Sequence, residues 1–469
     1  MSTLPTTRNH SLLTDVVAAM VLAPFLSQAA EKETPLLDEW LHAKYPESQP
    51  WDIGAEIRGR YEDKEDAGVV ANTDFISGTA VSREATYLRE KIHLGYKASP
   101  WVSAFVEGRD ASANDDPSAE DSLDLFQAYM IFGNAKEFPL TAQIGRQEMA
   151  YGDQRLIGKG DWSNTGRSFD AIKLRLENSF GWVDAFTSKV VLVDDGNFNV
   201  DNDYDYFSGI YASTKKLMPW QETQAYFLAR NSRPQAPNAI STGVPGSPST
   251  QRDIYTLGTL WKSDPEAFGG WDYSMELDYQ FGSVYNKTQL DRLDQQSYGV
   301  FLDAGYTWKS SCGTPRLGVG YEHGSGDSNP NDGKVETFEN LFGTQHRPYG
   351  LMDLVGARNM HIPKLEFTIK PVKGLTLGAD YLFFILDDTN DLFYPESGSG
   401  RSGNGYGINP GNNSFVGSEI DLYANYGINK WANYQIGYGH FFTSDYIDQS
   451  VGSAATDADW FYTQLILTF

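Results

Sequence analysis

Hydrophobic and polar residues alternate along much of this 469-residue chain. In WDYSMELDYQF, residues 271–281, every aromatic or aliphatic side chain falls on one face, and every acid, serine or glutamine falls on the other. A period of two residues predicts a β-strand with one apolar face. A soluble β-sandwich alternates in the same way, so this local pattern leaves a sandwich and a barrel both open.

About eighteen such segments recur along the chain. They lie near residues 51–61, 85–97, 101–110, 122–133, 138–147, 168–177, 182–192, 205–214, 221–230, 253–262, 271–282, 297–309, 314–324, 361–371, 375–386, 416–427, 431–442 and 457–469. The typical segment has about 10 residues. Soluble strands have about 5 to 6, whereas a tilted strand needs about 9 to 11 to cross a bilayer.

The connections between these segments alternate between short and long. Tight turns such as ASPW (98–101) and NSFG (178–181) alternate with long polar stretches, notably 147–168, 231–252, 325–360 and 387–415. Barrels of bacterial outer membranes combine short periplasmic turns, long extracellular loops and an even strand number, and closure leaves no unpaired edge in lipid. We therefore predict an all-β fold, a single closed antiparallel transmembrane β-barrel of about 18 strands over residues 51–469.

Both ends of the chain support an exported protein. Residues 1–30 have the order of a secretory signal peptide, with Arg8, the apolar run VVAAMVLAPFL and then SQAA. Residues 31–50 form a periplasmic leader segment in which PLLDEWLHAKYP could be an amphipathic helix. The last residues, WFYTQLILTF, resemble the C-terminal signature of outer-membrane barrels. We expect a location in the bacterial outer membrane, in contact with its lipid and lipopolysaccharide.

Composition excludes several classes of protein. Aromatic residues make up 14 % of the chain and glycine occurs 45 times, which favours strands and turns. A net charge of -25 argues against a nucleic-acid partner, because such proteins need a basic surface. The single cysteine, Cys312, has no partner for an intramolecular disulfide.

Cations nevertheless gather on the polar faces of the first strands. If the apolar faces meet lipid, the side chains that line the lumen include Arg58, Arg60, Arg89, Lys91, Arg109, Lys173 and Arg175. They either pair with inward acids such as Glu56 and Glu107 and hold the barrel shape, or select an anionic solute. A guanidinium group suits the second role, because it stays charged and binds a carboxylate through paired hydrogen bonds. Both roles can be filled by different residues.

Three stretches resemble the alginate export family of outer-membrane proteins: GRQEMAYGDQRLIGKGDWSNTGRSFDAIKL (145–174), residues 320–360, and VGSEIDLYANY (416–426). The resemblance implies an eighteen-stranded barrel that exports alginate, a polymer of uronic acids, past a positively charged constriction. It adds Arg146, Arg155 and Arg167 to Arg58 and Arg60 as residues for conductance and binding. Arg146 is in step with the lipid-facing Leu140 and Ile144, so it must lie at a strand end or a bulge, or the register must shift.

We expect a passive porin for an alginate-like polyuronate. The alternatives are a general or sugar-acid porin for small anionic solutes and, in another class, a non-conducting adhesin or structural barrel. We expect no enzyme, since no HExxH or GxSxG motif occurs, and no GxxxxGK[ST] motif provides for ATP. Periplasmic secretion components are possible partners. The long loops 147–168 and 325–360 either enter the lumen or remain on the surface.

We expect no cofactor and no metal site. The alternating Asp201, Asp203 and Asp205 of DNDYDYF could supply oxygen ligands to Ca²⁺. Plain solvated loop acids are the favoured interpretation of these three residues.

Overall fold

The computed structural model describes residues 36–77, 82–218, 220–233, 251–264, 268–286, 291–309, 311–344, 346–396 and 398–469. The expected signal peptide lies outside the described residues, as do residues 31–35 of the leader segment.

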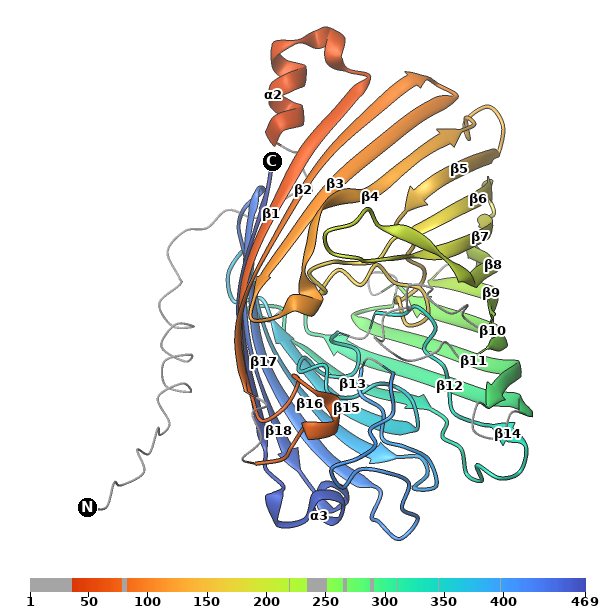
Figure 1. The fold of residues 1–469 in the computed structure, drawn as a ribbon. Coiled ribbons are helices and arrows are strands. Elements are labelled where there is room, and N and C mark those ends of the chain that lie inside the picture. Colours follow the sequence, from red (N-terminus) through yellow and green to blue (C-terminus); the bar gives the residue numbers. More distant parts are fainter. Residues whose placement is uncertain are drawn as a thin grey trace.

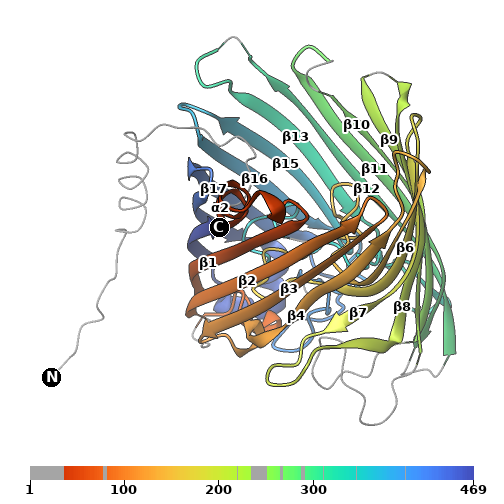
Figure 2. The same cartoon turned by 90° about the horizontal axis from the view of Figure 1, so that it is seen from above.

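The strands form one antiparallel sheet that closes on itself (Figures 1 and 2). They are β1 (Trp51–Glu65), β2 (Arg83–Ser99), β3 (Val102–Asn114), β4 (Asp121–Phe132), β5 (Leu140–Gln147), β6 (Phe169–Glu177), β7 (Trp182–Leu192), β8 (Val200–Met218), β9 (Gln221–Ser232), β10 (Arg252–Ser263), β11 (Trp271–Asn286), β12 (Asp291–Thr307), β13 (Arg316–Gly324), β14 (Lys334–Val335), β15 (Met360–Ile369), β16 (Leu375–Leu386), β17 (Phe415–Asn429), β18 (Ala432–Thr443) and β19 (Ala458–Thr468).

Closure comes from β1, which pairs with both β2 and β19. Of the 19 strands in the sheet, β14 is a two-residue segment that pairs parallel to β12, which leaves eighteen long strands in the wall. Each of the eighteen predicted segments coincides with one of them. The closed barrel predicted from the alternating pattern is confirmed.

Short and long connections lie at opposite ends of the barrel. Helix α2 (Leu36–Lys44) lies at the end with the tight turns, where Lys430 Nζ is 2.8 Å from Glu39 Oε1. Helix α3 (Asp445–Val451) lies at the end with the long loops. The 3₁₀ turns are η1 (Pro46–Ser48), η2 (Ala71–Thr73), η3 (Pro117–Ala119) and η4 (Gly452–Ala454). In the described part of the chain, no helix has the length and hydropathy that a membrane-spanning helix needs.

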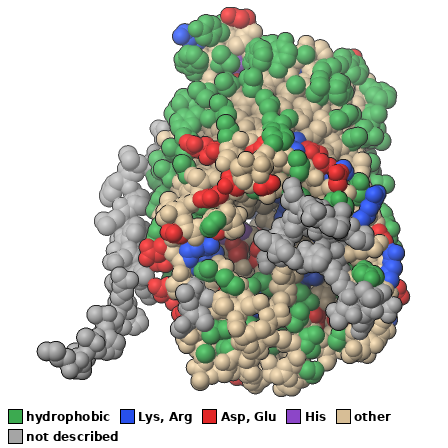
Figure 3. Space-filling view, in the orientation of Figure 1, with side chains coloured by type: hydrophobic (Ala, Val, Ile, Leu, Met, Phe, Trp, Pro, Cys, Tyr) green, Lys and Arg blue, Asp and Glu red, His purple; other side chains and the backbone are tan. Residues whose placement is uncertain are grey.

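The outer face of the wall is apolar, as the alternation predicts. On β6, Ile172 and Leu174 are 49 % and 43 % exposed, whereas their neighbours Phe169 and Ala171 face inward and are buried. Figure 3 shows hydrophobic side chains over the part of the wall next to α2, with charged side chains in a band across the middle of that face. The apolar surface suits contact with membrane lipid.

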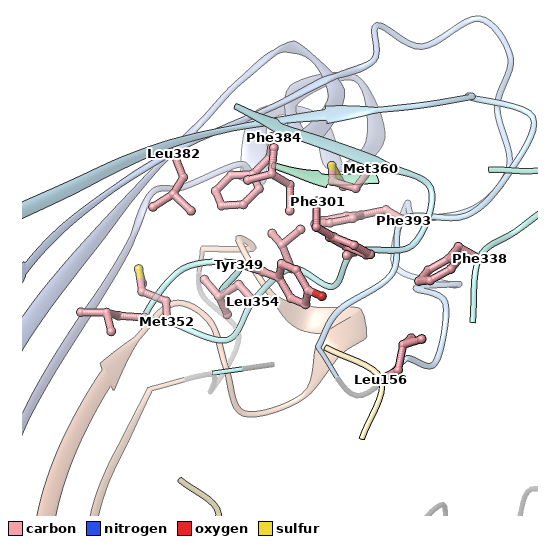
Figure 4. Packing of buried hydrophobic residues seen from close by; sticks show 14 of the residues in the cluster. Leu156, Phe301, Phe338, Tyr349, Met352, Leu354, Met360, Leu382, Phe384 and Phe393 are labelled. Carbon is pink, nitrogen blue, oxygen red and sulfur yellow. The ribbon is translucent and has the colours of Figure 1, made fainter. Parts of the chain in front are cut away.

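The lumen contains a hydrophobic core made by loops. Tyr349, Met352 and Leu354, from the loop between β13 and β15, pack beside Leu382 and Phe384 of β16 (Figure 4). Aliphatic and aromatic side chains of the loop between β5 and β6, such as Leu156, join the same cluster. Both long loops therefore enter the lumen, which resolves the alternative left open by the sequence.

The two inserted loops are also bonded to each other. Gly158 N donates to Phe342 O at 2.9 Å, and Phe342 N donates to Leu156 O at 3.0 Å, so the segments run together like a short parallel ladder. A Cβ atom at Gly343 would lie 1.9 Å from the carbonyl oxygen of Arg155, so only glycine fits at this crossing. The loops form one plug, which we define as residues 148–168, 336–344 and 346–359.

Candidate functional site

Two arginines of the wall hold the tip of the plug. Arg58 of β1 and Arg89 of β2 lie directly opposite each other in the sheet, and both are buried. Like charges in this position repel unless acceptors compensate them. Arg58 donates to the carbonyl oxygens of Asp161, at 2.5 Å, and Ser163, at 3.0 Å. Arg89 binds the carboxylates of Glu56, at 2.7 Å, and Asp161, at 3.0 Å.

Asp161 therefore brings a negative charge between two positive ones. Burial alone would raise the pKa of this loop carboxyl, but the charges of Arg89, Lys91 and Arg58 lower it below its ordinary value. Arg60 completes the contact. Its Nη1 donates to Trp162 O at 2.6 Å, its guanidinium lies 4.0 Å from the Trp162 ring centre, and its Nε is 2.8 Å from Glu62. Arg58, Arg60 and Arg89 are thus a clamp on residues 161–164.

Arg155 anchors the plug to the opposite wall. Its guanidinium binds Asp303 of β12 at 2.9 Å and Glu322 of β13 at 3.1 Å, and lies 3.6 Å from Glu276 of β11. Lys364 of β15 shares Asp303 and Glu322, at 3.0 and 2.9 Å. These contacts balance the charge of Arg155 inside the protein, so it holds the plug in place.

A third anchor uses carboxylates on β17. Asp421 accepts a hydrogen bond from Leu351 N, and Glu419 accepts one from Met352 N, each at 3.1 Å. Both acids are almost fully buried. Sequence reasoning missed them, although strict alternation along VGSEIDLYANY does place both on the inward face.

Glu339 of the plug binds a group of arginines. Its carboxylate is 3.1 Å from Arg230 of β9, 3.0 Å from Arg252 of β10 and 3.5 Å from Arg358. Burial alone would raise the pKa of Glu339, but the three guanidinium groups lower it to about 2. The carboxylate is therefore ionised at neutral pH, and the plug gains a charged attachment to this part of the wall.

Other predicted cations are bound in similar ways. Arg109 forms an ion pair with the buried Asp121, and Arg175 binds Asp184 through two hydrogen bonds of 2.6 and 2.8 Å. Arg167 donates to the carbonyl oxygens of Phe342 and Gly343 in the plug. Burial lowers the pKa of Arg167 to about 10, partly offset by the charge of Glu396.

The expected position of Arg146 in the channel is wrong. Arg146 pairs across the sheet with Asp170. This pair lies two residues from the lipid-facing pair Ile144 and Ile172, so the Arg146 side chain projects from the outer face of the barrel. There it binds Asp170 at 2.9 Å and the carbonyl oxygen of Asn199 at 3.0 Å. The alternation was right in placing Arg146 outside, and no register shift returns it to the lumen.

Two of the ten predicted cations are lysines that face the lumen, and the Nζ of one of them, Lys91, lies 4.9 Å from the centre of the Phe126 ring. Lys91 of β2 and Lys173 of β6 face inward and are half-buried, and neither forms an ion pair with any described residue. Between them lie three inward rings, His93, Phe105 and Tyr129. The centre of the Phe105 ring is 5.3 Å from that of His93 and 5.2 Å from that of Tyr129, with the rings nearly parallel. We call these five residues the lysine–aromatic row.

The barrel fold agrees with a match to a known family. The profile described as alginate export matches residues 49–461, which is nearly the whole barrel. The chain belongs to the alginate export family. A comparison with curated proteins finds no match.

Solved structures similar to this family member are porins. OccK11 (OpdR) of Pseudomonas aeruginosa is 12 % identical, with a TM-score of 0.52 over 95 % of this chain and 99 % of its own. OccK2 (OpdF) of the same species, solved in complex with glucuronate, is 11 % identical, with a TM-score of 0.57 over 89 % and 98 %. A BenF-like porin from Pseudomonas fluorescens Pf-5 is 9 % identical, with a TM-score of 0.57 over 90 % and 99 %. At these identities the likeness concerns the fold.

Family and fold identify an outer-membrane porin. In this porin the inward acids are distributed unevenly around the wall. Inward acids gather on the strands from β11 to β17, namely Asp272, Glu276, Asp278, Asp303, Glu322, Glu366, Asp380, Glu419 and Asp421. Several of them form ion pairs with Arg155, Arg316 and Lys364.

The acids considered for calcium are bound to cations of the porin. Lys189 Nζ is 2.7 Å from Asp201 and 2.5 Å from Asp203, and Asp205 binds Arg230 at 2.6 Å. Their oxygens are engaged in ion pairs, and the geometry gives no support to a calcium site.

Proposed function

We propose that this porin passes small carboxylated sugars, such as uronates, and that the lysine–aromatic row is their binding surface. The observation that carries the proposal is the contrast between Lys91 and Lys173 and the other predicted cations. The eight arginines are used by carboxylates or by carbonyl oxygens, whereas these two ammonium groups face the lumen with no ion pair among the described residues.

The chemistry of the row matches that of a sugar acid. A lysine attracts a carboxylate as a mobile point charge, without the fixed geometry of an arginine fork. The rings of His93, Phe105 and Tyr129 offer flat apolar surfaces to the C–H face of a pyranose. Weak binding at several adjacent places permits conduction, because a single tight site would retain the solute.

The plug supports small solutes rather than a long polymer. Four separate anchors hold it, at the clamp, at Arg155, at Glu339 and on β17. A polymer chain would need a continuous wide path, and a core of buried aromatic and aliphatic side chains occupies part of the lumen.

Export of an alginate-like polyuronate is the second candidate. The family match over residues 49–461 favours it. In that case the plug would have to leave the lumen during transport, and the inward arginines of the clamp would become available to the polymer.

Liposome swelling with the purified porin tests both candidates. We expect swelling in glucuronate to exceed swelling in glucose, and Lys91→Gln with Lys173→Gln to remove this preference. Lys136→Gln, at the exposed β4–β5 turn, is the control. Equal rates for glucuronate and glucose in the unaltered porin would contradict the proposal. Block of single-channel current by long polyuronate chains, with no preference among monomers, would favour the second candidate.

A further inference from the structure

Two histidines and an aspartate meet on the outside of the barrel. His323 of β13 and His361 of β15 are directly opposite each other in the sheet. Their neighbours Glu322 and Ile362 face inward and are fully buried, so the two imidazoles belong to the outer face. Asp387 follows the last residue of β16. All three lie at the end of the barrel that carries the long loops, far from the lysine–aromatic row.

The donor atoms of this cluster converge. One ligand atom of each residue lies within 4.8 Å of the others, and His361 Nε2 is 2.9 Å from Asp387 Oδ1. The two imidazole rings stack with centres 4.3 Å apart and planes 9° apart. Ligands of a tetrahedral zinc ion lie roughly 3.3 Å from each other, given bonds of about 2.0 to 2.1 Å. The cluster needs only side-chain adjustments of an ångström or so to reach that arrangement.

Each of the three side chains is oriented by a second hydrogen bond. His323 Nδ1 is 3.2 Å from the carbonyl oxygen of Met360, which fixes the proton on Nδ1 and leaves Nε2 as the ligand atom. His361 Nδ1 is 2.7 Å from the Tyr321 hydroxyl. Asp387 Oδ2 accepts a hydrogen bond from Gly326 N at 2.8 Å, which leaves Oδ1. Metal-binding histidines usually have their other ring nitrogen bonded in this way.

We propose that His323, His361 and Asp387 form a Zn²⁺ site on the outer face of this porin. Two imidazole nitrogens and one carboxylate oxygen leave the fourth tetrahedral position to solvent. His361 and Asp387 are partly exposed, so an ion can reach the site from outside. The ion would join the end of β13, where the 325–359 loop begins, to the end of β16, where the 387–414 loop begins.

The test uses the full-length, untagged porin in detergent, because a histidine tag would itself take up zinc. Binding of Zn²⁺ is measured by competition with a chromophoric chelator, and Co²⁺ serves as an optical probe of tetrahedral geometry. We expect one ion per chain. His323→Gln and His361→Gln abolish uptake, and Tyr321→Phe, which removes only an orienting hydroxyl, weakens it about 10-fold to 100-fold.

His440→Gln is the matched control. His440 is also on the outer face and has an aspartate partner, Asp459, at 2.9 Å, but it belongs to no three-ligand group among the described residues. Zinc uptake by this variant equals that of the unaltered porin. Absence of uptake by the unaltered porin, full uptake by His323→Gln, or equal loss in His440→Gln overturns the proposal. Should the glutamine variants fail to fold, undiminished affinity in a folded Tyr321→Phe variant overturns it.

Discussion

Arg58 Nη1 donates a hydrogen bond to the carbonyl oxygen of Asp161 at 2.5 Å, across 103 residues of sequence. Arg89, opposite Arg58 on the next strand, reaches the same oxygen at 3.0 Å. The two guanidinium groups thus share one acceptor. Without the inserted loop, the positive charges of Arg58 and Arg89 would repel each other, and the loop compensates this repulsion. The arginines that first suggest a binding site for an anion bind a segment of the protein itself.

Removing one member of the clamp should loosen the plug. We expect Arg58→Gln to raise single-channel conductance and to add fluctuations between levels, because residues 161–164 lose a charged anchor. Planar-bilayer recording measures both. Arg292→Gln, which breaks the exposed pair with Asp253, is the control and should leave the trace unchanged. A normal conductance in Arg58→Gln would contradict the role of the clamp.

Ion selectivity should respond to the charges of Lys91 and Lys173. Lys91→Glu with Lys173→Glu reverses two charges that face the lumen, so the reversal potential in a salt gradient should move toward cation preference. Lys136→Glu makes the same kind of change at an exposed turn and should have little effect. If both proteins gave the same reversal potential, the lysines would have no part in selection.

The attachment of Glu339 should contribute strongly to stability. Glu339→Gln removes the carboxylate that Arg230, Arg252 and Arg358 share, and removing one partner of a buried ion pair costs about 3 to 5 kcal/mol. Urea unfolding in detergent measures the loss. Glu336→Gln lies three residues earlier and contacts Ser328 instead, so its unfolding free energy should stay close to that of the unaltered porin.

Glu396 should make conduction depend on pH. Burial and the charge of Asp353 raise the pKa of Glu396 to about 7, while Arg167 and Lys64 oppose the shift. The carboxyl is neutral below that pH and negative above it. Anion preference should therefore fall as the pH rises from about 6 to about 8, and Glu396→Gln should remove this change. A reversal potential with the same pH dependence in both proteins would assign the titration to another group.

Arg146 should contribute to stability but not to ion selectivity, because its side chain projects from the outer face of the barrel. We expect Arg146→Gln to keep the reversal potential of the unaltered porin and to lower resistance to urea, since Asp170 and Asn199 lose their partner. An altered reversal potential would return Arg146 to the conduction path.

The barrel could be predicted from the sequence because the alternation that reveals each strand lies within a short stretch of residues. Alternate residues in a strand face opposite sides, so Ile172 and Lys173 are assigned by counting alone. The plug could not be predicted in this way. Nothing near Arg58 indicates that its acceptor is Asp161, and nothing near Glu419 indicates Met352. Motif resemblance placed Arg146 in the channel, whereas the alternation had already placed it outside.

Closure of the wall joins the first strand to the last. Residues Glu56 to Glu65 of β1 pair with Thr468 to Asp459 of β19. The hydrogen bonds between β1 and β19 cannot form until the C-terminal strand has left the ribosome and crossed the inner membrane. During that transit, β1 is an exposed edge that can pair with other chains.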